Sequence, residues 1–438
     1  MKIYSVLAVI MLLCACSVSD DSKTAPPGVG TDACTIAGQK QYVLDSMRDV
    51  YFWNDSLPLS VDTGDFATPE DLLAYLISFQ PLDDFSYIDL AASDAQFFGE
   101  GQYEGYGFSS RFETADDLRF LTVFVSSPAA EAGFERGQRI LMLNGRTISD
   151  IEANEGVGAL FAMPALDFTI RRPDNSEETI SVAKGLVTID PLPQSRIISL
   201  PGGTTVGYLE ITTFISTADA AFADVFLAFQ QANVTDVILD LRYNGGGLIS
   251  TTELLGNYLG GAIAVNSIFS KTLFNDDHSA SNRIAFFQNL FESISLSRLV
   301  VIATDRTASA SELIANSMAS HVDVSIVGSV TRGKPVGQLG IPFCDKILRP
   351  TAFETVNSDD EGGYFDGLPV DCPVQDNVLI PIGDETDPNV TTALFLVENG
   401  ACPALPVSAQ ALQKSDRGRD ELKSERGGPA WRRTAGAW

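Results

Sequence analysis

The chain is organised around one run of residues, Thr304-Asp305-Arg306-Thr307-Ala308-Ser309-Ala310-Ser311-Glu312-Leu313-Ile314-Ala315-Asn316. The apolar run before it, residues 299–303, is typical of a buried strand, and residues 313–318 carry apolar side chains at helical spacing. The run therefore predicts a strand-to-helix turn with small hydroxyl residues at the start of the helix. Unpaired N–H groups and the positive end of the helix dipole would stabilise an oxyanion beside a serine there. Taken alone, the same hydroxyl residues are also typical of helix N-caps.

Two further blocks flank this run along the chain. Upstream, the apolar strand 236–241 leads into Arg242-Tyr243-Asn244-Gly245-Gly246-Gly247; downstream, the apolar strand 324–328 precedes Val330-Thr331-Arg332-Gly333-Lys334-Pro335-Val336-Gly337-Gln338. In order and spacing, the three blocks resemble the motifs D-L-R-x-N-x-G-G, S-A-S-A-S-E and G-K-x-x-x-Q of the S41 peptidases, the C-terminal processing or tail-specific proteases. The resemblance implies a serine endopeptidase in which Ser309 is the nucleophile, Lys334 is the general base 25 residues later, and Gln338 orients the lysine.

A serine hydroxyl needs a neighbouring base to become a nucleophile, and this chain has few histidines to supply one. On a continuous helix His321 would lie roughly 18 Å from Ser309, although His278 could reach the serine from elsewhere. A lysine can act instead if burial lowers its pKa toward neutrality, and the residues next to Lys334 bring no carboxylate that would keep it charged. No H-E-x-x-H motif occurs, so we expect neither a metal nor another cofactor.

Two backbone N–H groups are the expected donors to an oxyanion. One belongs to Ala310, which follows the nucleophile, and the other to Gly246 in the glycine turn, because glycine lets the backbone approach a tetrahedral intermediate closely. Asp240 and Arg242 are expected to be structural. Glu312 is expected to cap the helix start or to form a pair near it.

Strands and helices alternate from residue 197 to residue 385, which predicts an α/β core. An alanine- and phenylalanine-rich helix is expected at 218–231 and a last short helix at 391–398. The family resemblance adds a ClpP/crotonase-like arrangement for the peptidase core, residues 197–400. We expect residues 271–296 to be an insertion near the cleft that carries an aromatic-rich helix.

Two smaller domains are predicted before the core. Residues 34–100 have helical periodicity, and within them 81–87 resemble the D-P-Y-S-x-Y stretch of the family. Residues 103–186 resemble a PDZ domain, a β-rich domain that binds C-terminal peptides by strand addition. Its carboxylate-binding loop would be Tyr106-Gly107-Phe108-Ser109. Such a domain would bind substrate C-termini or gate the cleft; alternatively, it would pack against the core without binding peptides.

The N-terminus predicts export and a lipid anchor. Residues 1–16 resemble a bacterial lipoprotein signal peptide with Cys16 as the lipidated residue, the alternative being a plain secretory peptide. Residues 17–33 would be a flexible linker and residues 403–438 a disordered tail. The expected location is the bacterial cell envelope, with the chain tethered to the outer membrane and facing the periplasm or the cell surface.

Four cysteines lie outside the signal peptide: Cys34, Cys344, Cys372 and Cys402. An even number in an oxidising compartment predicts disulfides, and three connectivities are open. We favour Cys344–Cys372, which would close a loop around the acidic segment between these two cysteines, together with Cys34–Cys402, which would join the two ends of the chain.

Composition limits the functions that fit. The 438-residue chain has ordinary globular composition with 45% hydrophobic residues, and its net charge of −28 argues against nucleic-acid binding. The expected partners are protein or peptide substrates, recognised through their C-termini, and the membrane; a homo-oligomer is compatible with the sequence. Two alternatives to an endopeptidase stay open: a non-catalytic PDZ lipoprotein that scaffolds or senses unfolded envelope proteins, and an esterase or amidase for small substrates.

Overall fold

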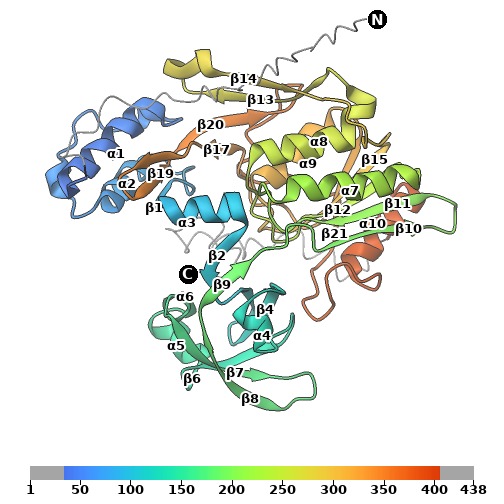
Figure 1. The fold of residues 1–438 in the computed structure, drawn as a ribbon, viewed down its shortest axis with the longest axis horizontal. Helices are drawn as coiled ribbons and strands as arrows, with labels where there is room; N and C mark the ends of the chain where they lie inside the picture. The colour runs from blue at the N-terminus through green and yellow to red at the C-terminus, as the bar shows by residue number, and fades with distance from the viewer. Residues whose placement is uncertain (1–33, 405–438) are drawn as a thin grey trace, which may run out of the picture.

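The computed structural model describes residues 34–404 of the chain (Figure 1). The expected signal peptide, the lipidated Cys16, the linker and nearly all of the expected disordered tail lie outside these residues. The described chain divides into helices at the left of Figure 1, a central α/β core and a small β-rich domain at the bottom. Among the described helices, none combines the length and the apolar character needed to cross a bilayer.

The core is built on a six-stranded sheet in the order β10-β11-β12-β15-β16-β21. Only β10 is antiparallel to its neighbour. The strand bounds are β10 Gln194–Ser199, β11 Thr205–Glu210, β12 Asp236–Asp240, β15 Arg298–Ala303, β16 Asp323–Gly328 and β21 Cys372–Pro373. All five residues of β12 are buried, as expected for a parallel strand that is covered on both faces. The expected α/β class is therefore observed.

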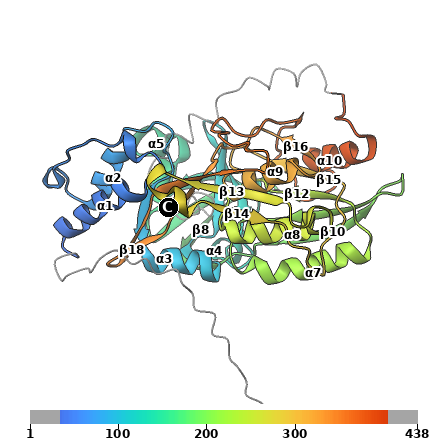
Figure 2. The same ribbon diagram turned by 90° about the horizontal axis from the view of Figure 1, so that it is seen from above.

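Alternate residues of each core strand face opposite layers of helices. Val237 and Leu239 pack with α7 (Ala218–Gln231), α8 (Ile249–Ala264) and α9 (Ala310–Ala319), whereas Ile238 packs with α10 (Pro388–Asn399). Figure 2 shows α7 and α8 on one side of these strands and α10 on the other. The expected helix at 218–231 has these bounds in the structure, and the last helix extends beyond the expected 391–398 by three residues at its N-terminus and one at its C-terminus.

Two further sheets continue the core toward the N-terminal helices. One has the order β14-β13-β20-β17 and the other β1-β19-β18. Their bounds are β14 Arg283–Phe286, β13 Ile268–Phe274, β20 Thr351–Val356, β17 Val336–Gln338, β1 Tyr87–Leu90, β19 Lys346–Arg349 and β18 Ile341–Phe343. The expected aromatic-rich helix within residues 271–296 is wrong. That segment forms a hairpin of β13 and β14 around a 3₁₀ turn, Asp276–Ser281, because β14 pairs its backbone with β13.

The N-terminal domain packs onto the core through these sheets. Its helices α1 (Ile36–Val50) and α2 (Pro69–Ile77) share an apolar cluster with Phe343 and Leu348 of the β18–β19 hairpin. Thr68 forms a capping box with Asp71 at the start of α2, as its sequence suggests. Strand β1, helix α3 (Ala91–Ala95) and a π-helix (Gln96–Glu100) then lead into the small domain.

Both favoured disulfide pairings are wrong. The structure joins Cys34 to Cys344 and Cys372 to Cys402. Cys344 lies at the tip of the β18–β19 hairpin, which packs against α1, whereas Cys372 begins β21 and Cys402 follows α10 on the same side of the core sheet. The pairing therefore follows from which elements pack together, and no disulfide closes the acidic segment between Cys344 and Cys372.

The small domain has its own core. A ribbon of β2 (Gln102–Gly105) and β9 (Gly185–Thr188) leads into a sheet of order β3-β4-β5-β7-β8, in which β6 also pairs with β5. The bounds are β3 Phe108–Thr114, β4 Asp117–Val123, β5 Arg139–Leu143, β6 Arg146–Thr147, β7 Ala165–Arg171 and β8 Glu177–Ala183, with helices α4 Pro128–Glu131, α5 Ile148–Asn154 and α6 Val157–Phe161. Buried aromatic rings fill the interior: Tyr106, Phe108, Phe120, Phe134, Phe161 and Phe168.

Candidate active site

Two turns meet at the carboxyl ends of neighbouring parallel strands β12 and β15, where ligand sites of open α/β sheets occur. Several hydrogen bonds join them. The Ala308 N–H donates to the Asn244 carbonyl at 3.1 Å, Ser311 Oγ donates to the same oxygen at 3.0 Å, and Thr307 Oγ1 donates to the Leu241 carbonyl at 2.7 Å. The serine run and the glycine turn therefore form one unit.

Ser309 has an unusual backbone conformation. It directly precedes α9 with φ 56° and ψ −117°, a region that residues other than glycine rarely occupy. Strained conformations of this kind cluster at functional sites, where the surrounding structure enforces them. The strain therefore supports a role for Ser309 beyond that of a simple N-cap.

The fully buried carboxylate of Glu312 joins the serine segment to the lysine segment. Its Oε2 atom accepts hydrogen bonds from the backbone N–H groups of Ser309 and Lys334, both at 2.8 Å. Its Oε1 atom accepts from the Gly333 N–H at 2.7 Å and from Thr331 Oγ1 at 2.5 Å. Burial raises the pKa of this carboxyl above its ordinary value, and the four hydrogen bonds oppose that rise. Glu312 therefore does more than cap the helix start or pair near it, because its carboxylate also binds the backbone of the segment that carries Lys334.

Lys334 and Gln338 interact directly. Lys334 is 7% exposed, and its Nζ atom donates to Oε1 of Gln338 at 2.8 Å. Gln338 lies in β17, and its amide nitrogen donates to the carbonyl oxygens of Phe85 and Arg349. The structure thus brings together the lysine and the glutamine that the sequence places four residues apart.

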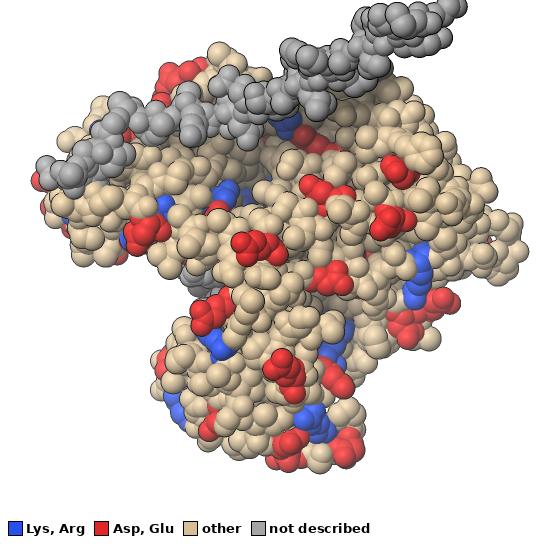
Figure 3. Space-filling model, viewed as in Figure 1, with Lys and Arg blue, Asp and Glu red and all other residues tan. Residues whose placement is uncertain are grey.

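Ser309, Lys334 and Gln338 line one cavity of about 260 Å³, together with Ala310 and Gly246. Its other walls are largely apolar or aromatic: Tyr87, Phe97, Phe98, Leu248, Ile249, Leu313, Val336 and Phe353. Arg349 also lines it and forms an ion pair with Asp94. No aspartate or glutamate of residues 34–404 is among the lining residues. Figure 3 shows the surface hollowed between the N-terminal helices and the α/β core.

The two expected oxyanion donors differ in their present contacts. The N–H of Ala310, at the first position of α9, has no acceptor within the described chain. Gly246 lies against the serine turn, since a Cβ built on it would be 2.8 Å from the Ser309 Cβ. However, its N–H donates to Oδ1 of Asn244 at 2.9 Å, so it does not point freely into the cavity as expected. Sequence reasoning gave Asn244 no role, although it occupies a fixed position in the glycine-turn motif.

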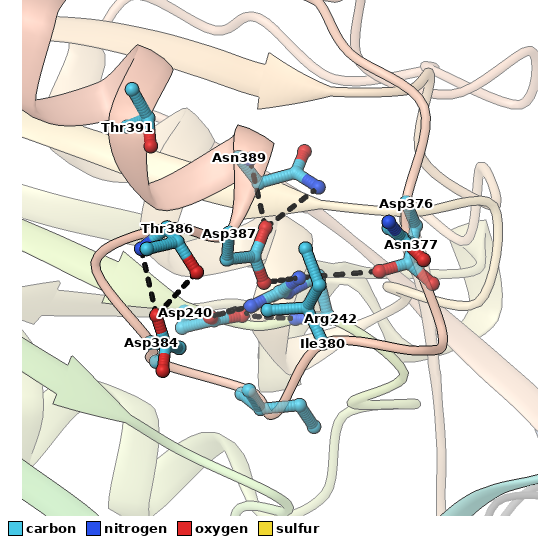
Figure 4. A network of polar contacts seen from close by, with 12 residues as sticks. Asp240, Arg242, Asp376, Asn377, Ile380, Asp384, Thr386, Asp387, Asn389 and Thr391 are labelled. Atoms are coloured by element: carbon cyan, nitrogen blue, oxygen red, sulfur yellow. Dashed lines mark hydrogen bonds and ion pairs between the residues drawn. The ribbon is translucent and has the colours of Figure 1, made fainter. Parts of the chain in front are cut away.

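Asp240 and Arg242 belong to a buried ionic network behind the glycine turn (Figure 4). The fully buried Arg242 pairs with Asp240 and Asp387 at 2.6 Å and with Asp376 at 3.2 Å. Asp376 also pairs with Arg111 and Arg136 of the small domain. Although burial opposes ionisation of Asp376, the three arginines lower its pKa below the ordinary value. These contacts are structural and connect the small domain to the core.

Neither histidine of the chain lines the cavity. His278 Nε2 lies 2.8 Å from Oδ1 of Asp49, and His321 Nε2 lies 2.9 Å from the Ile268 carbonyl. The geometry therefore gives no support to a histidine base. Within the described residues no group of three or more His, Cys, Asp and Glu side chains could hold a metal ion.

The expected peptide-binding loop lies at one edge of the small domain's sheet. Tyr106 and Phe108 are fully buried in the domain core, and Gly107 has φ 86°. Strand β3, which begins at Phe108, pairs only with β4 in the sheet, so no strand of the described residues pairs with its other edge. Ser109 is buried on this strand, and its hydroxyl has no hydrogen-bond partner in the described part of the chain.

Comparisons with known proteins point to one peptidase family. The profile of Peptidase family S41 matches residues 205–373, and that of the Peptidase S41 N-terminal domain matches residues 38–87. The two matched segments together span half of the chain.

Curated relatives include the carboxy-terminal processing protease CtpA of Bacillus subtilis, 23% identical over 299 residues that cover 66% of this chain and 60% of the relative. The chloroplastic carboxyl-terminal-processing peptidase 2 of Arabidopsis thaliana is 26% identical over 54% of this chain and 46% of its own length. The chain thus spans about half to three-fifths of the length of these relatives.

Solved structures share the fold. A crystal structure from Bacteroides fragilis that is assigned to the S41 proteases aligns with a TM-score of 0.66 at 23% identity, covering 82% of this chain and 97% of that one. The photosystem II D1 C-terminal processing protease aligns with a TM-score of 0.52 at 20% identity, covering 79% and 94% of the two chains.

Proposed function

We propose, from the premise that this chain belongs to peptidase family S41, that it is a serine endopeptidase with a Ser309–Lys334 dyad. One observation carries the proposal: the two side chains line the same cavity, and their backbone N–H groups share one oxygen of the Glu312 carboxylate. The nucleophile and the base are therefore held in a fixed relation by a single buried group.

In the proposed reaction, Ser309 Oγ attacks a peptide carbonyl while the neutral Lys334 amine takes its proton. The tetrahedral intermediate then collapses, the lysine returns the proton to the leaving amine, and an acyl-serine remains. A water molecule, deprotonated by the same lysine, hydrolyses that ester. Gln338 would hold the lysine amine in position through its 2.8 Å contact with Nζ.

The oxyanion would be stabilised by the Ala310 N–H and by an N–H of the glycine turn. Ala310 is the first residue of α9, so the positive end of the helix dipole acts at the same place. For Gly246 to be the second donor, its N–H must exchange the Asn244 carboxamide for the oxyanion when substrate binds. The proximity of Gly246 to Ser309 supports this assignment.

The proposed substrates are unfolded proteins or peptides. The apolar and aromatic cavity walls favour an apolar side chain near the cleaved bond, and the Arg349 cation disfavours a basic one. The small domain is proposed to be a PDZ domain that binds substrate C-termini along the unpaired edge of β3, with Tyr106, Gly107, Phe108 and Ser109 at the carboxylate loop.

We further propose an extracytoplasmic location with a lipid anchor at Cys16. The two disulfides support the compartment, since disulfides persist chiefly in oxidising environments. The anchor rests on the sequence of the first 16 residues alone.

Hydrolysis of denatured casein tests the proposal against its two alternatives. The wild type is expected to cleave casein, and Ser309→Ala and Lys334→Ala are expected to lose at least about a thousandfold in kcat/KM. A wild type that binds unfolded protein without cleaving it would favour the scaffold. Hydrolysis of small esters but not of casein would favour the esterase or amidase. Full activity in Lys334→Ala would overturn the base assignment.

A further inference from the structure

One residue of the N-terminal domain reaches the candidate dyad. The carbonyl oxygen of Phe85 accepts a hydrogen bond from the Gln338 amide nitrogen, although the two residues are 253 positions apart. The ring of the same residue lies 5.1 Å from Nζ of Lys334. Phe85 thus contacts both the lysine and the glutamine that orients it.

The carbonyl contact determines which way the Gln338 side chain points. Its Nε2 atom donates to the carbonyls of Phe85 and Arg349, and a carbonyl oxygen can only accept. The acceptor atom Oε1 must then face the other way, toward Lys334 Nζ. A flipped amide would set oxygen against two oxygens and nitrogen against the lysine.

Phe85 is itself rigidly held. The buried Asp83 carboxylate accepts hydrogen bonds from the N–H groups of Phe85 and Ser86, at 3.0 and 2.9 Å, and from the Ser86 hydroxyl at 2.6 Å. The same carboxylate accepts from Tyr51 at the end of α1 and from Thr351 at the start of β20. The segment is therefore fixed both to the helical domain and to the sheet that carries Gln338.

We propose that Phe85 is a positioning residue for the reaction, an inference that rests on the proposed dyad. Its carbonyl fixes the orientation of the Gln338 amide. Its ring stabilises the ammonium that forms when Lys334 takes the Ser309 proton, because the face of an aromatic ring attracts a cation. The N-terminal domain thereby completes the active site, and catalysis depends on its docking to the core.

The ring contact is tested by replacing Phe85 with residues that differ in whether they have an aromatic face and in the charge of that face. Phe85→Leu removes the aromatic face, Phe85→Tyr retains it, and pentafluorophenylalanine at position 85 retains the shape while reversing the charge of the face. The control is Phe79→Leu, the same substitution at a surface position of the same domain. Readouts are kcat and KM on denatured casein and the rate at which a fluorophosphonate labels Ser309, with Ser309→Ala as the unlabelled reference.

A cation–π contact corresponds to roughly 2- to 30-fold in rate. We expect Phe85→Leu and the pentafluoro variant to lower kcat and the labelling rate by this factor with KM within about twofold. Phe85→Tyr and Phe79→Leu should match the wild type. The pentafluoro variant keeps the packing, so the test stands even if Phe85→Leu does not fold.

Three results would overturn the inference. In the first, the wild type is active, and both Phe85→Leu and the pentafluoro variant match its kcat and its labelling rate. In the second, Phe79→Leu loses as much activity as Phe85→Leu. In the third, the losses appear in KM alone. A wild type that neither cleaves casein nor reacts with the fluorophosphonate would overturn the proposed function, and this inference with it.

Discussion

At the residue scale, Glu312 shows how one buried charge can organise a site. Its carboxylate accepts from three backbone N–H groups and one hydroxyl, all of which donate toward it. A carboxylate satisfies four donors because both of its oxygens only accept. A neutral amide of the same shape cannot, since its NH₂ group would face at least one backbone N–H.

We therefore predict that Glu312→Gln lowers the free energy of unfolding by about 2–4 kcal/mol, because it leaves buried donors unpaired. Since it also frees the Ser309 and Lys334 segments from each other, kcat/KM should fall roughly 100-fold. Urea denaturation and casein hydrolysis measure the two effects, with Glu398→Gln on the exposed face of α10 as the control. If Glu312→Gln is less stable than the wild type but equally active, Glu312 does not position Ser309 and Lys334 for the reaction.

A second buried carboxyl, Glu210, predicts a pH dependence of stability. Burial and the neighbouring Asp240 raise its pKa to about 8. A raised pKa in the folded state means that the folded chain holds the proton more tightly, so this contribution to stability is full below the unfolded pKa, about 4.5, and is lost as the pH rises through about 8.

Between these pH values the slope from this one group is about −1.4 kcal/mol per pH unit. Glu210→Gln should remove the slope and make the variant more stable than the wild type at pH 9. Urea denaturation at pH 6 and pH 9 tests this, and Glu131→Gln, at an exposed position, should keep the slope of the wild type. Parallel pH curves for wild type and Glu210→Gln would contradict the assignment.

At the element scale, the glycine turn after β12 packs directly on the serine turn. Gly246 has φ 103°, and a Cβ there would lie 2.8 Å from the Ala308 carbonyl and 2.9 Å from the Ala310 nitrogen. Contacts this short require the backbone to move, and the backbone concerned belongs to the proposed nucleophile, Ser309, and to the residues on either side of it. Space and conformation therefore both require glycine at this position.

Gly246→Ala is predicted to reduce kcat at least about 100-fold. Gly145→Ala in the small domain is the matched control, since Gly145 also has a positive φ, 72°, but nothing lies within 4 Å of the added Cβ. The control should lose only about 1 kcal/mol of stability and no activity. Comparable activity losses in both variants would show that backbone strain, and not the contact with Ser309, is responsible.

Elements whose pattern is local were predicted from the sequence with little error. The apolar runs of β12 and β15 and the helix at 218–231 depend on residues close in the chain. The hairpin of β13 and β14 was missed because its strands are stabilised by pairing with each other and with β20, which periodicity does not reveal.

The candidate site was predicted as far as its motifs reached. Ser309, Lys334 and Gln338 each lie inside a motif that suggests their chemistry. Phe85 also lies in a stretch, 81–87, that resembles the family, but nothing in that stretch indicates a contact with Gln338, 253 residues away. The predicted disulfide pairing is wrong for the same reason, since the pairing depends on which surfaces pack together. The contact of Gly246 with Asn244 required coordinates as well.

At the scale of the whole molecule, the N-terminal domain and the core both contribute residues to the candidate active site, so their attachment matters. Phe85 comes from one and Lys334 and Gln338 from the other, and the Cys34–Cys344 disulfide joins the start of α1 to the hairpin that follows Gln338. That bond spans 310 residues, whereas Cys372–Cys402 spans only 30. The second bond lies beside α10, on the face of the core sheet opposite α7, α8 and α9. The two bonds therefore permit a matched comparison.

We predict that replacing Cys34 and Cys344 by serine destabilises the protein more than replacing Cys372 and Cys402. The chain-entropy account of cross-links gives a difference of about 2 kcal/mol for loops of these lengths. The first variant should also lose casein hydrolysis at urea concentrations where the core, followed by far-UV circular dichroism, is still folded, because undocking of α1 and its neighbours removes Phe85 from Lys334. In the second variant activity and structure should be lost together. If activity and circular dichroism coincide in both variants, the N-terminal domain does not undock independently, and catalysis does not depend on this disulfide.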